Sequence, residues 1–221
     1  MNARKHIYVL NPNSSERVTT CIDRAVARLR IEGGPVITCL RLAQGPAGVQ
    51  TQADIDMLVP HLRAQALSLR ESASAYVIAC FSDPGLYALR EAVAQPVLGI
   101  AETGVLTALT LGHRFGVLSI LPTSIPRHLR YFGAMGVKDR LAADLSINMG
   151  VAGLADESEA AQRLGETGKR LRDEYGADVV VLGCAGMAAQ RDALEQTLGI
   201  PVVEPTQATV ASALGRCMLG W

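Results

Sequence analysis

Two short apolar segments look like copies of one another: YVIAC at residues 76–80 and VVLGC at residues 180–184. Each has the composition of a strand that is buried on both faces of a parallel sheet, and each ends at a cysteine. Turn-forming or small residues follow both cysteines, and then a helical pattern. Reacting groups in open α/β sheets usually lie at the carboxyl ends of strands. The two segments therefore predict a site between two similar halves, with Cys80 and Cys184 approaching a substrate from opposite sides.

Strand-like and helix-like patterns alternate along the whole chain, which predicts an α/β fold with mainly parallel sheets. The predicted strands are residues 6–10, 35–40, 75–80, 97–100, 115–120, 145–149, 179–184 and 201–204. The predicted helices are residues 16–30, 53–70, 85–94, 104–111, 126–135, 157–175, 188–198 and 207–218. Pro60 is expected to kink the second helix or to shift its start.

A long internal repeat favours two lobes over a single eight-stranded barrel. The first strand ends in a polar turn at residues 11–14 (NPNS), and a later strand ends similarly at residues 122–124 (PTS). The spacing from Leu10 to Cys80 nearly equals that from Leu118 to Cys184, as in a duplicated lobe. We expect two pseudosymmetric lobes with the active site in the cleft between them. Lobe 1 would comprise residues 1–97 and 206–221, and lobe 2 residues 98–205.

Composition excludes several classes of protein. The 221 residues are 49% hydrophobic, and 21 basic residues balance 21 acidic ones, which is unlike the charge pattern of a nucleic-acid-binding protein. No leader or membrane-spanning segment is recognisable, so we expect a cytoplasmic protein with a small-molecule substrate and neither nucleic-acid nor membrane partners. Homo-oligomer formation stays open. The five cysteines are irregularly spaced and do not cluster with the four histidines, so neither a disulfide framework nor a metal site is expected.

The residues that follow the two cysteines suggest how the thiols are activated. Residues 80–85 (CFSDPG) contain a good N-cap in Ser82 or Asp83, so a helix start is expected to lower the pKa of Cys80. Residues 184–187 (CAGM) are small enough for backbone N–H groups to approach a ligand. The alternative is that both thiols are inert and buried, but their matched positions favour a functional pair. Cys21, Cys39 and Cys217 lie within regular patterns and are interpreted as structural.

Two loops allow more than one interpretation. Asn11 and its neighbours can bind a polar ligand, or can simply form a turn and cap the next helix, and the turn at residues 122–124 has the same ambiguity. The loop at residues 45–48 (GPAG) is either a connector or a lid over the cleft.

Taken together, these motifs resemble the Asp/Glu racemase superfamily, and within it the hydantoin and allantoin racemase branch. The resemblance covers nearly the whole chain. The segments that carry it are NPNS (11–14), GPA (45–47), ACFSDPGL (79–86), GIAE (99–102), LGHRF (111–115) and VLGCAGM (181–187). It implies a two-lobe α/β fold, no cofactor, and Cys80 and Cys184 as a proton-exchanging pair. Residues 125–153 match less closely and are expected to shape the substrate pocket.

Details of the two cysteine motifs separate this chain from other branches of the superfamily. Glutamate racemases typically have Cys-Asn-Thr and Cys-Thr-His at these places, and arylmalonate decarboxylases have glycine at the position of Cys80. The expected function is cofactor-independent racemisation of 5-substituted hydantoins or allantoin. The candidate substrate-binding residues are Asn11, Phe81, Ser82, Asp83, Thr123, Ser124, Gly183, Ala185 and Gly186, with backbone N–H groups of residues 81–83 and 185–187 as donors to an enolate. The alternatives are amino-acid racemisation, maleate cis–trans isomerisation, decarboxylation, or non-catalytic binding of a small molecule.

Overall fold

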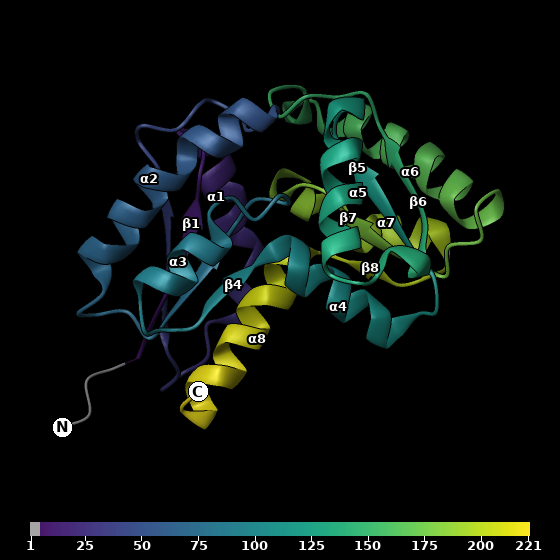
Figure 1. Cartoon of the computed structure of the whole chain (residues 1–221). Helices are drawn as coiled ribbons and strands as arrows, with labels where there is room; N and C mark the ends of the chain where they lie inside the picture. Colours follow the sequence, from purple (N-terminus) through teal and green to yellow (C-terminus); the bar gives the residue numbers. More distant parts are fainter. Residues whose placement is uncertain (1–4) are drawn as a thin grey trace.

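The computed structural model describes residues 5–221 and contains two four-stranded parallel sheets (Figure 1). The first has the order β2-β1-β3-β4 and the second the order β6-β5-β7-β8, so the same arrangement occurs twice. The strands are β1 (His6–Asn11), β2 (Val36–Arg41), β3 (Ala75–Ile78), β4 (Val97–Gly99), β5 (Phe115–Ser119), β6 (Leu141–Ser146), β7 (Val179–Leu182) and β8 (Val202–Val203). This architecture confirms the predicted fold class, and the apolar segments that end in cysteine are the inner strands β3 and β7.

Helices flank both sheets in the alternating order expected of parallel strands. The α-helices are α1 (Glu16–Ala25), α2 (Gln52–Leu69), α3 (Leu86–Ala92), α4 (Ile100–Leu111), α5 (Ile125–Ala134), α6 (Glu157–Asp173), α7 (Arg191–Leu198) and α8 (Pro205–Leu219). Short 3-10 turns are η1 (Ala27–Leu29), η2 (Pro122–Ser124), η3 (Lys138–Arg140), η4 (Gly153–Ala155) and η5 (Ala185–Gln190). Pro60 does not interrupt α2, since it lies on the exposed face, where water can bind the carbonyl group left without an N–H partner.

Two helices cross between the lobes. Helix α4 follows β4 of the first sheet but packs against β5, β7 and β8 of the second, and α8 follows β8 but packs against β1, β3 and β4. The two helices lie side by side at the centre of the molecule (Figure 1). Gly104 permits this contact, because a Cβ atom there would lie only 2.7 Å from the Cβ of Pro205.

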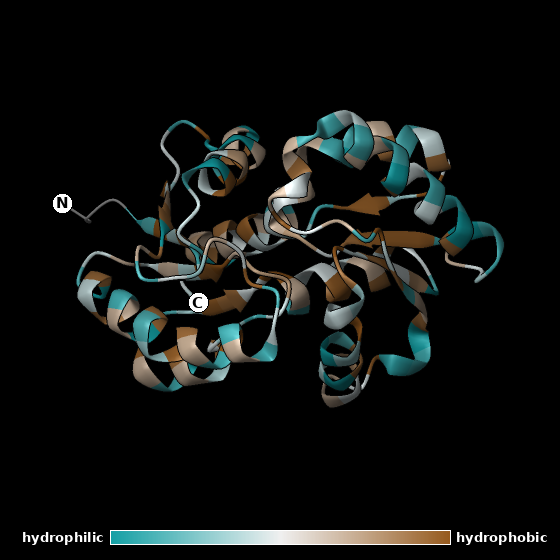
Figure 2. Cartoon of the chain, turned by 90° about the horizontal axis from the view of Figure 1, so that it is seen from above, coloured by the Kyte–Doolittle hydropathy of each residue, from teal (hydrophilic) through white to brown (hydrophobic). Residues whose placement is uncertain are grey.

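The apolar core is continuous through both lobes. One cluster joins Val77 in β3 to Val181 in β7 through Val105 of α4, and all three are fully buried. A second cluster fills the space between the first sheet, α2 and α3, around Leu62 and Ile78. The apolar strands lie at the centre of each lobe in Figure 2. The shared cluster makes the lobes a single packed unit and thereby holds β3 and β7 in place relative to each other.

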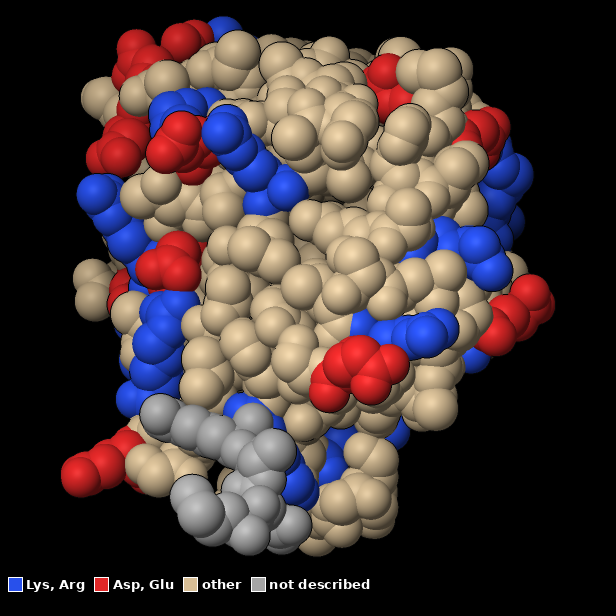
Figure 3. Space-filling model, turned by 90° about the vertical axis from the view of Figure 1, so that its left-hand side faces the viewer, with Lys and Arg blue, Asp and Glu red and all other residues tan. Residues whose placement is uncertain are grey.

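The surface carries charges of both signs. Acidic and basic side chains are interspersed on the face shown in Figure 3, in line with the balanced composition. Within residues 5–221, no helix combines the length and apolar character needed to cross a membrane. Over the same range, His, Cys, Asp and Glu side chains form no group of three suited to holding a metal ion.

Candidate active site

Both cysteines lie at the carboxyl ends of equivalent strands and line one cavity. Cys80 follows β3 and Cys184 follows β7, and the cavity between them measures about 40 Å³. Its remaining lining residues are Asn13, Val18, Val49, Ala79, Phe81, Ser82, Ile120, Ser124, Arg127, His128, Val151, Gly183, Ala185 and Gly186. A thiol from each lobe therefore approaches the same small volume.

Most of the predicted binding residues line this cavity, but three do not: Asn11, Asp83 and Thr123. The Asn11 amide is fully buried and donates to Asn13 Oδ1 (3.0 Å) and Thr19 Oγ1 (2.9 Å), so it stabilises the turn that presents Asn13. Thr123 is exposed, and its carbonyl oxygen accepts a hydrogen bond from Arg127.

Asp83 stabilises a different helix from the one predicted. It has a left-handed backbone conformation (φ 43°), and its carboxylate accepts from the N–H groups of Ala101 (2.9 Å) and Glu102 (2.8 Å) at the start of α4. The prediction that Ser82 or Asp83 caps the following helix is wrong, because Gly85 precedes α3 and no side chain caps it. Gly99 makes room for the carboxylate, since a Cβ atom there would lie 2.2 Å from Asp83 Cγ. Tyr131 of lobe 2 also donates to Asp83 (2.8 Å), which connects the Cys80 loop to the second lobe.

The prediction of a lowered thiol pKa is also wrong. Burial raises the pKa of Cys80 to about 12, with smaller upward contributions from Cys184 and Asp83. The N–H of Ser82 and the charge of Arg127 oppose this increase but do not overcome it. The free-energy cost of removing a thiolate from water exceeds the stabilisation that these few groups supply. Burial thus favours the protonated form of both thiols at neutral pH.

Cys184 has a similar environment in the other lobe. Burial raises its pKa to about 11, while the N–H of Gly186 donates to Sγ at 3.4 Å and lowers it. Glu204, the buried N-cap of α8, also raises the pKa of Cys184, as Asp83 does that of Cys80. Burial is the main reason that neither thiolate forms readily, and a negative charge on Cys184 opposes a second one on Cys80.

Two polar side chains that sequence reasoning missed lie in the cavity. Arg127 and His128 are consecutive residues of α5, in the segment that was expected only in general terms to shape the pocket. His128 is buried, and its Nδ1 lies 2.8 Å from Asp144 Oδ2. The PTS turn and the helical pattern after it were the available signal. They did not identify which face of the helix points toward Cys80.

Two loops, one around Val49 and one around Val151, form part of the wall of the cavity. Val49 lines it from lobe 1 and Val151 from lobe 2, and Gly48 packs so tightly on Val151 that a Cβ atom would lie 3.0 Å from Val151 Cβ. Arg17 donates to the Val151 carbonyl oxygen at 2.9 Å. A substituted five-membered ring is larger than the space between the thiols, and these two loops form part of the wall of that space. The contacts favour interpreting the GPAG segment as a lid.

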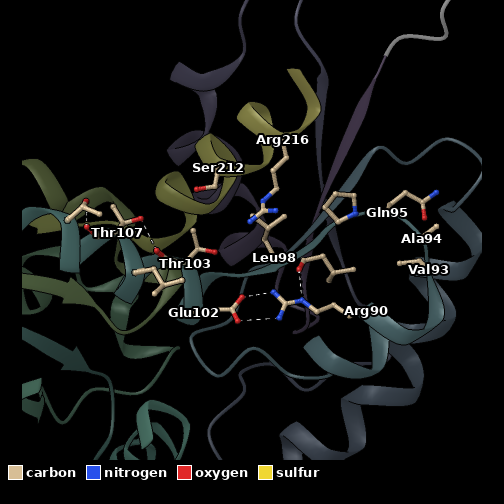
Figure 4. Close-up of a pocket in the computed structure, with 14 residues that line it drawn as sticks. Arg90, Val93, Ala94, Gln95, Leu98, Glu102, Thr103, Thr107, Ser212 and Arg216 are labelled. Atoms are coloured by element: carbon tan, nitrogen blue, oxygen red, sulfur yellow. Dashed lines mark hydrogen bonds and ion pairs between the residues drawn. The ribbon is translucent and has the colours of Figure 1, made fainter. Parts of the chain in front are cut away.

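Larger cavities lie outside the space between the thiols. One of about 280 Å³ adjoins it and shares Ser82, Arg127 and His128. Another, of about 560 Å³, lies between α3, β4, α4 and α8, where Arg90 and Glu102 form an ion pair (Figure 4). No cysteine lines this last cavity, so the reacting groups point to the thiol cavity as the site.

A family model described as Asp/Glu/Hydantoin racemase matches residues 7–213. The chain belongs to this family. A hydantoin racemase from Paenarthrobacter aurescens is 34% identical, over 97% of this chain and 92% of the relative. The structure of an allantoin racemase from Klebsiella pneumoniae superposes with a TM-score of 0.90 at 30% identity, covering 98% of this chain and 89% of the other. An allantoin racemase from Pseudomonas fluorescens reaches a TM-score of 0.93 at 25% identity, with 97% and 92% covered. Like these relatives, the chain is an isomerase of the racemase class.

Proposed function

We propose that the chain racemises 5-substituted hydantoins, a class that includes allantoin, by two-cysteine proton transfer at C5 without a cofactor. The observation that carries the proposal is the placement of Cys80 and Cys184 at equivalent strand ends around one cavity. Relatives named for hydantoin and allantoin racemisation support the substrate class.

The reaction needs one thiolate and one thiol at the same time. The thiolate takes the C5 proton, and the electron pair of the broken C–H bond passes to the C4 carbonyl oxygen to give an enolate. The opposite thiol then gives its proton to the other face of C5. The product leaves with the protonation states of Cys80 and Cys184 exchanged, so the enzyme works in both directions.

The high thiol pKa values define the role of the closed cavity. Burial favours the neutral form of both sulfurs, and a thiolate that does form is poorly solvated and therefore strongly basic. Lid closure would exclude water from the carbanion during the transfer. The small cavity volume is consistent with a site that closes tightly around the reacting carbon.

The test follows L-5-benzylhydantoin and S-allantoin in D2O by optical rotation and by NMR detection of deuterium at C5. We expect loss of optical activity with incorporation of deuterium. Cys80→Ala and Cys184→Ala should each abolish racemisation, whereas Cys217→Ala in α8 serves as the matched control and should retain it. Full racemisation by either active-site variant would refute the two-cysteine mechanism.

A further inference from the structure

Arg127 and His128 are adjacent on α5 and line both the thiol cavity and the 280 Å³ cavity beside it. We propose that they form a donor–acceptor pair that recognises the C4=O and N3–H groups of the hydantoin ring, with Arg127 stabilising the enolate oxygen. The inference rests on the proposed function, because it takes the ring as the substrate. It assigns these two residues to substrate recognition and enolate stabilisation.

The hydrogen bonds of His128 determine which ring nitrogen is available. Nδ1 lies 2.8 Å from Asp144 Oδ2, and Ser119 Oγ donates to Asp144 Oδ1 at 2.5 Å. Because the carboxylate only accepts, Nδ1 carries a proton; in the proposed role the imidazole is neutral and Nε2 is its acceptor. The side-chain hydrogen bonds of His128 within residues 5–221 all use Nδ1, which leaves Nε2 for a ligand.

Aromatic contacts hold the imidazole in this orientation. Phe81 packs edge-on against the His128 ring with centroids 5.2 Å apart, and Phe132 lies 6.0 Å away. Phe81 also follows Cys80 directly in the chain, so the position of the His128 ring is coupled to that of the Cys80 thiol. The imidazole of His128 is therefore held in one orientation at the wall of the site.

Arg127 presents a donor with no protein partner. Its Nη1 donates to the carbonyl oxygens of Thr123 (3.2 Å) and Gln50 (3.3 Å), and Nη2 donates to Ser124 Oγ (3.4 Å). These contacts hold the guanidinium group between the lobes. Its Nε is buried and has no hydrogen-bond partner in the described part of the chain. A buried N–H without a partner is costly, so an acceptor supplied by a ligand there is favourable.

Three of the six backbone donors predicted for the enolate are already engaged. The N–H of Asp83 donates to the Cys80 carbonyl oxygen (2.9 Å), and that of Met187 to the Cys184 carbonyl oxygen (3.0 Å). The N–H of Gly186 donates to the Cys184 sulfur. A cationic side chain beside Cys80 is thus better placed to stabilise the developing charge.

The charges and protons of the reaction balance without a change in the protonation state of Arg127. The proton moves from C5 to a thiolate, and the electron pair moves to O4, where the Arg127 Nε–H bond stabilises the negative charge. The second thiol then protonates C5, the O4 charge disappears, and Arg127 keeps its proton throughout. His128 accepts a hydrogen bond from N3–H and transfers nothing.

The pair also distinguishes ring substrates from free amino acids. A cyclic imide places a C=O acceptor beside an N–H donor, which matches Arg127 Nε and His128 Nε2. The carboxylate of an α-amino acid places two acceptor oxygens there, and one of them would face the lone pair on His128. Specificity therefore arises from a repulsive contact as well as from an attractive one.

The decisive test compares the binding of hydantoin, 1-methylhydantoin and 3-methylhydantoin to the full chain, by ligand-observed NMR titration. These probes have no substituent at C5, so binding is measured apart from racemisation. We expect 3-methylhydantoin to bind at least tenfold more weakly than 1-methylhydantoin, because a methyl group on N3 removes the hydrogen bond to His128 and a methyl group on N1 does not. Equal binding of the two methyl derivatives would overturn the proposal, and this measurement requires no protein variant.

Variants then assign the two halves of the pair. Asp144→Asn can donate to Nδ1 and so favour the opposite tautomer, which should abolish the discrimination against 3-methylhydantoin. Arg127→Gln should lower kcat for L-5-benzylhydantoin about a hundredfold, with a smaller change in KM. The control is Arg63→Gln on the exposed face of α2, which removes the same charge and should change kcat less than threefold. An equal effect of the two arginine variants would reject the role of Arg127.

The outcomes separate this inference from the proposed function. Discrimination between the methylhydantoins without racemisation of any substrate would support the pair and refute the racemisation proposal. Racemisation without discrimination between the methylhydantoins would support the proposed function and refute the role of the pair. Absence of both binding and turnover would refute both.

Discussion

The two lobes place their thiols alike but support them differently. Cys80 is followed by an irregular turn, and Asp83 within it reaches across to cap α4. Cys184 is followed directly by η5, and α8 is capped by Glu204, which immediately precedes it. The strand order is the same in both sheets, so the difference arises in the loops and not in the architecture.

The helices that follow β1 and β5, the equivalent strands of the two sheets, show the same contrast more strongly. Helix α1 follows β1 and contributes the apolar Val18 to the cavity, whereas α5 follows β5 and contributes Arg127 and His128. Proton transfer requires similar groups on both faces of the reacting carbon. The ring of the proposed substrate has distinct edges, so recognition calls for different groups on the two sides. The duplicated fold thus provides symmetry for the chemistry, while local differences orient the substrate.

The equivalence of the thiols is tested most directly by removing one at a time. Cys80→Ser and Cys184→Ser should each lower racemisation roughly a thousandfold, because one proton-transfer group is missing. Each variant should still exchange the C5 proton of one enantiomer for deuterium without inversion, and the two should prefer opposite enantiomers. The measurement is NMR of D- and L-5-benzylhydantoin in D2O with chiral chromatography. Preference of both variants for the same enantiomer would show that the thiols do not face opposite sides of C5.

The pH dependence of kcat/KM tests whether burial raises the pKa of both thiols. Burial raises the pKa of Cys80 to about 12 and that of Cys184 to about 11, and the fraction of thiolate grows as pH rises toward these values. The rate should therefore increase about tenfold per pH unit from pH 7 to 10. Arg127→Gln should displace this rise to higher pH, since the Arg127 charge lowers the pKa of Cys80. A plateau that begins below pH 8 would contradict this account.

The Asp83 cap can be disturbed through the glycine that accommodates it. Gly99→Ala would place Cβ 2.2 Å from Asp83 Cγ, so the carboxylate must move away from the start of α4. We expect the free energy of unfolding in urea to fall by about 2 kcal/mol. Gly133→Ala is the matched control, because no atom lies within 4 Å of its added Cβ and alanine favours helix, so its stability should be unchanged or higher. Equal stability of the two variants would show that the close approach of Asp83 to Gly99 is unimportant.

The buried carboxyl groups at the starts of α4 and α8 make the stability of the chain depend on pH. Burial raises the pKa of Asp83 from 3.8 to about 7, and burial also raises the pKa of Glu204. Between about pH 4 and 7 the folded chain retains the Asp83 proton that the unfolded chain releases, so stability should decrease as pH rises. One such group contributes at most about 1.4 kcal/mol per pH unit. Urea unfolding across this pH range should show a flatter profile for Asp83→Asn, and a profile unchanged from that of the parent chain would contradict the shift.

Some features of the site were predictable because they depend on chain order alone. An apolar segment of strand length that ends in a cysteine places that cysteine at a sheet edge, and the repeat of β3 in β7 brings two such edges together. The side chains of Arg127 and His128 could not be assigned in this way. Their helix was predicted to within a residue at each end, but the rotation of a helix about its axis depends on which residues pack on the sheet. The target of Asp83 was also unpredictable, because it caps a helix that begins 17 residues later.

The sequence by itself determined the parallel two-lobe architecture, the repeated order of strands and helices along the chain, and the positions of Cys80 and Cys184 at strand ends. These features follow from local apolar patterns and from the spacing of motifs, both of which can be read from the order of residues in the chain. Only the tertiary structure decided the crossing of α4 and α8, the closure of the loops over the cavity and the raised pKa values of the thiols. Burial, electrostatic field and hydrogen-bond partners arise from groups that are distant in sequence, and they become defined only when the two lobes pack together.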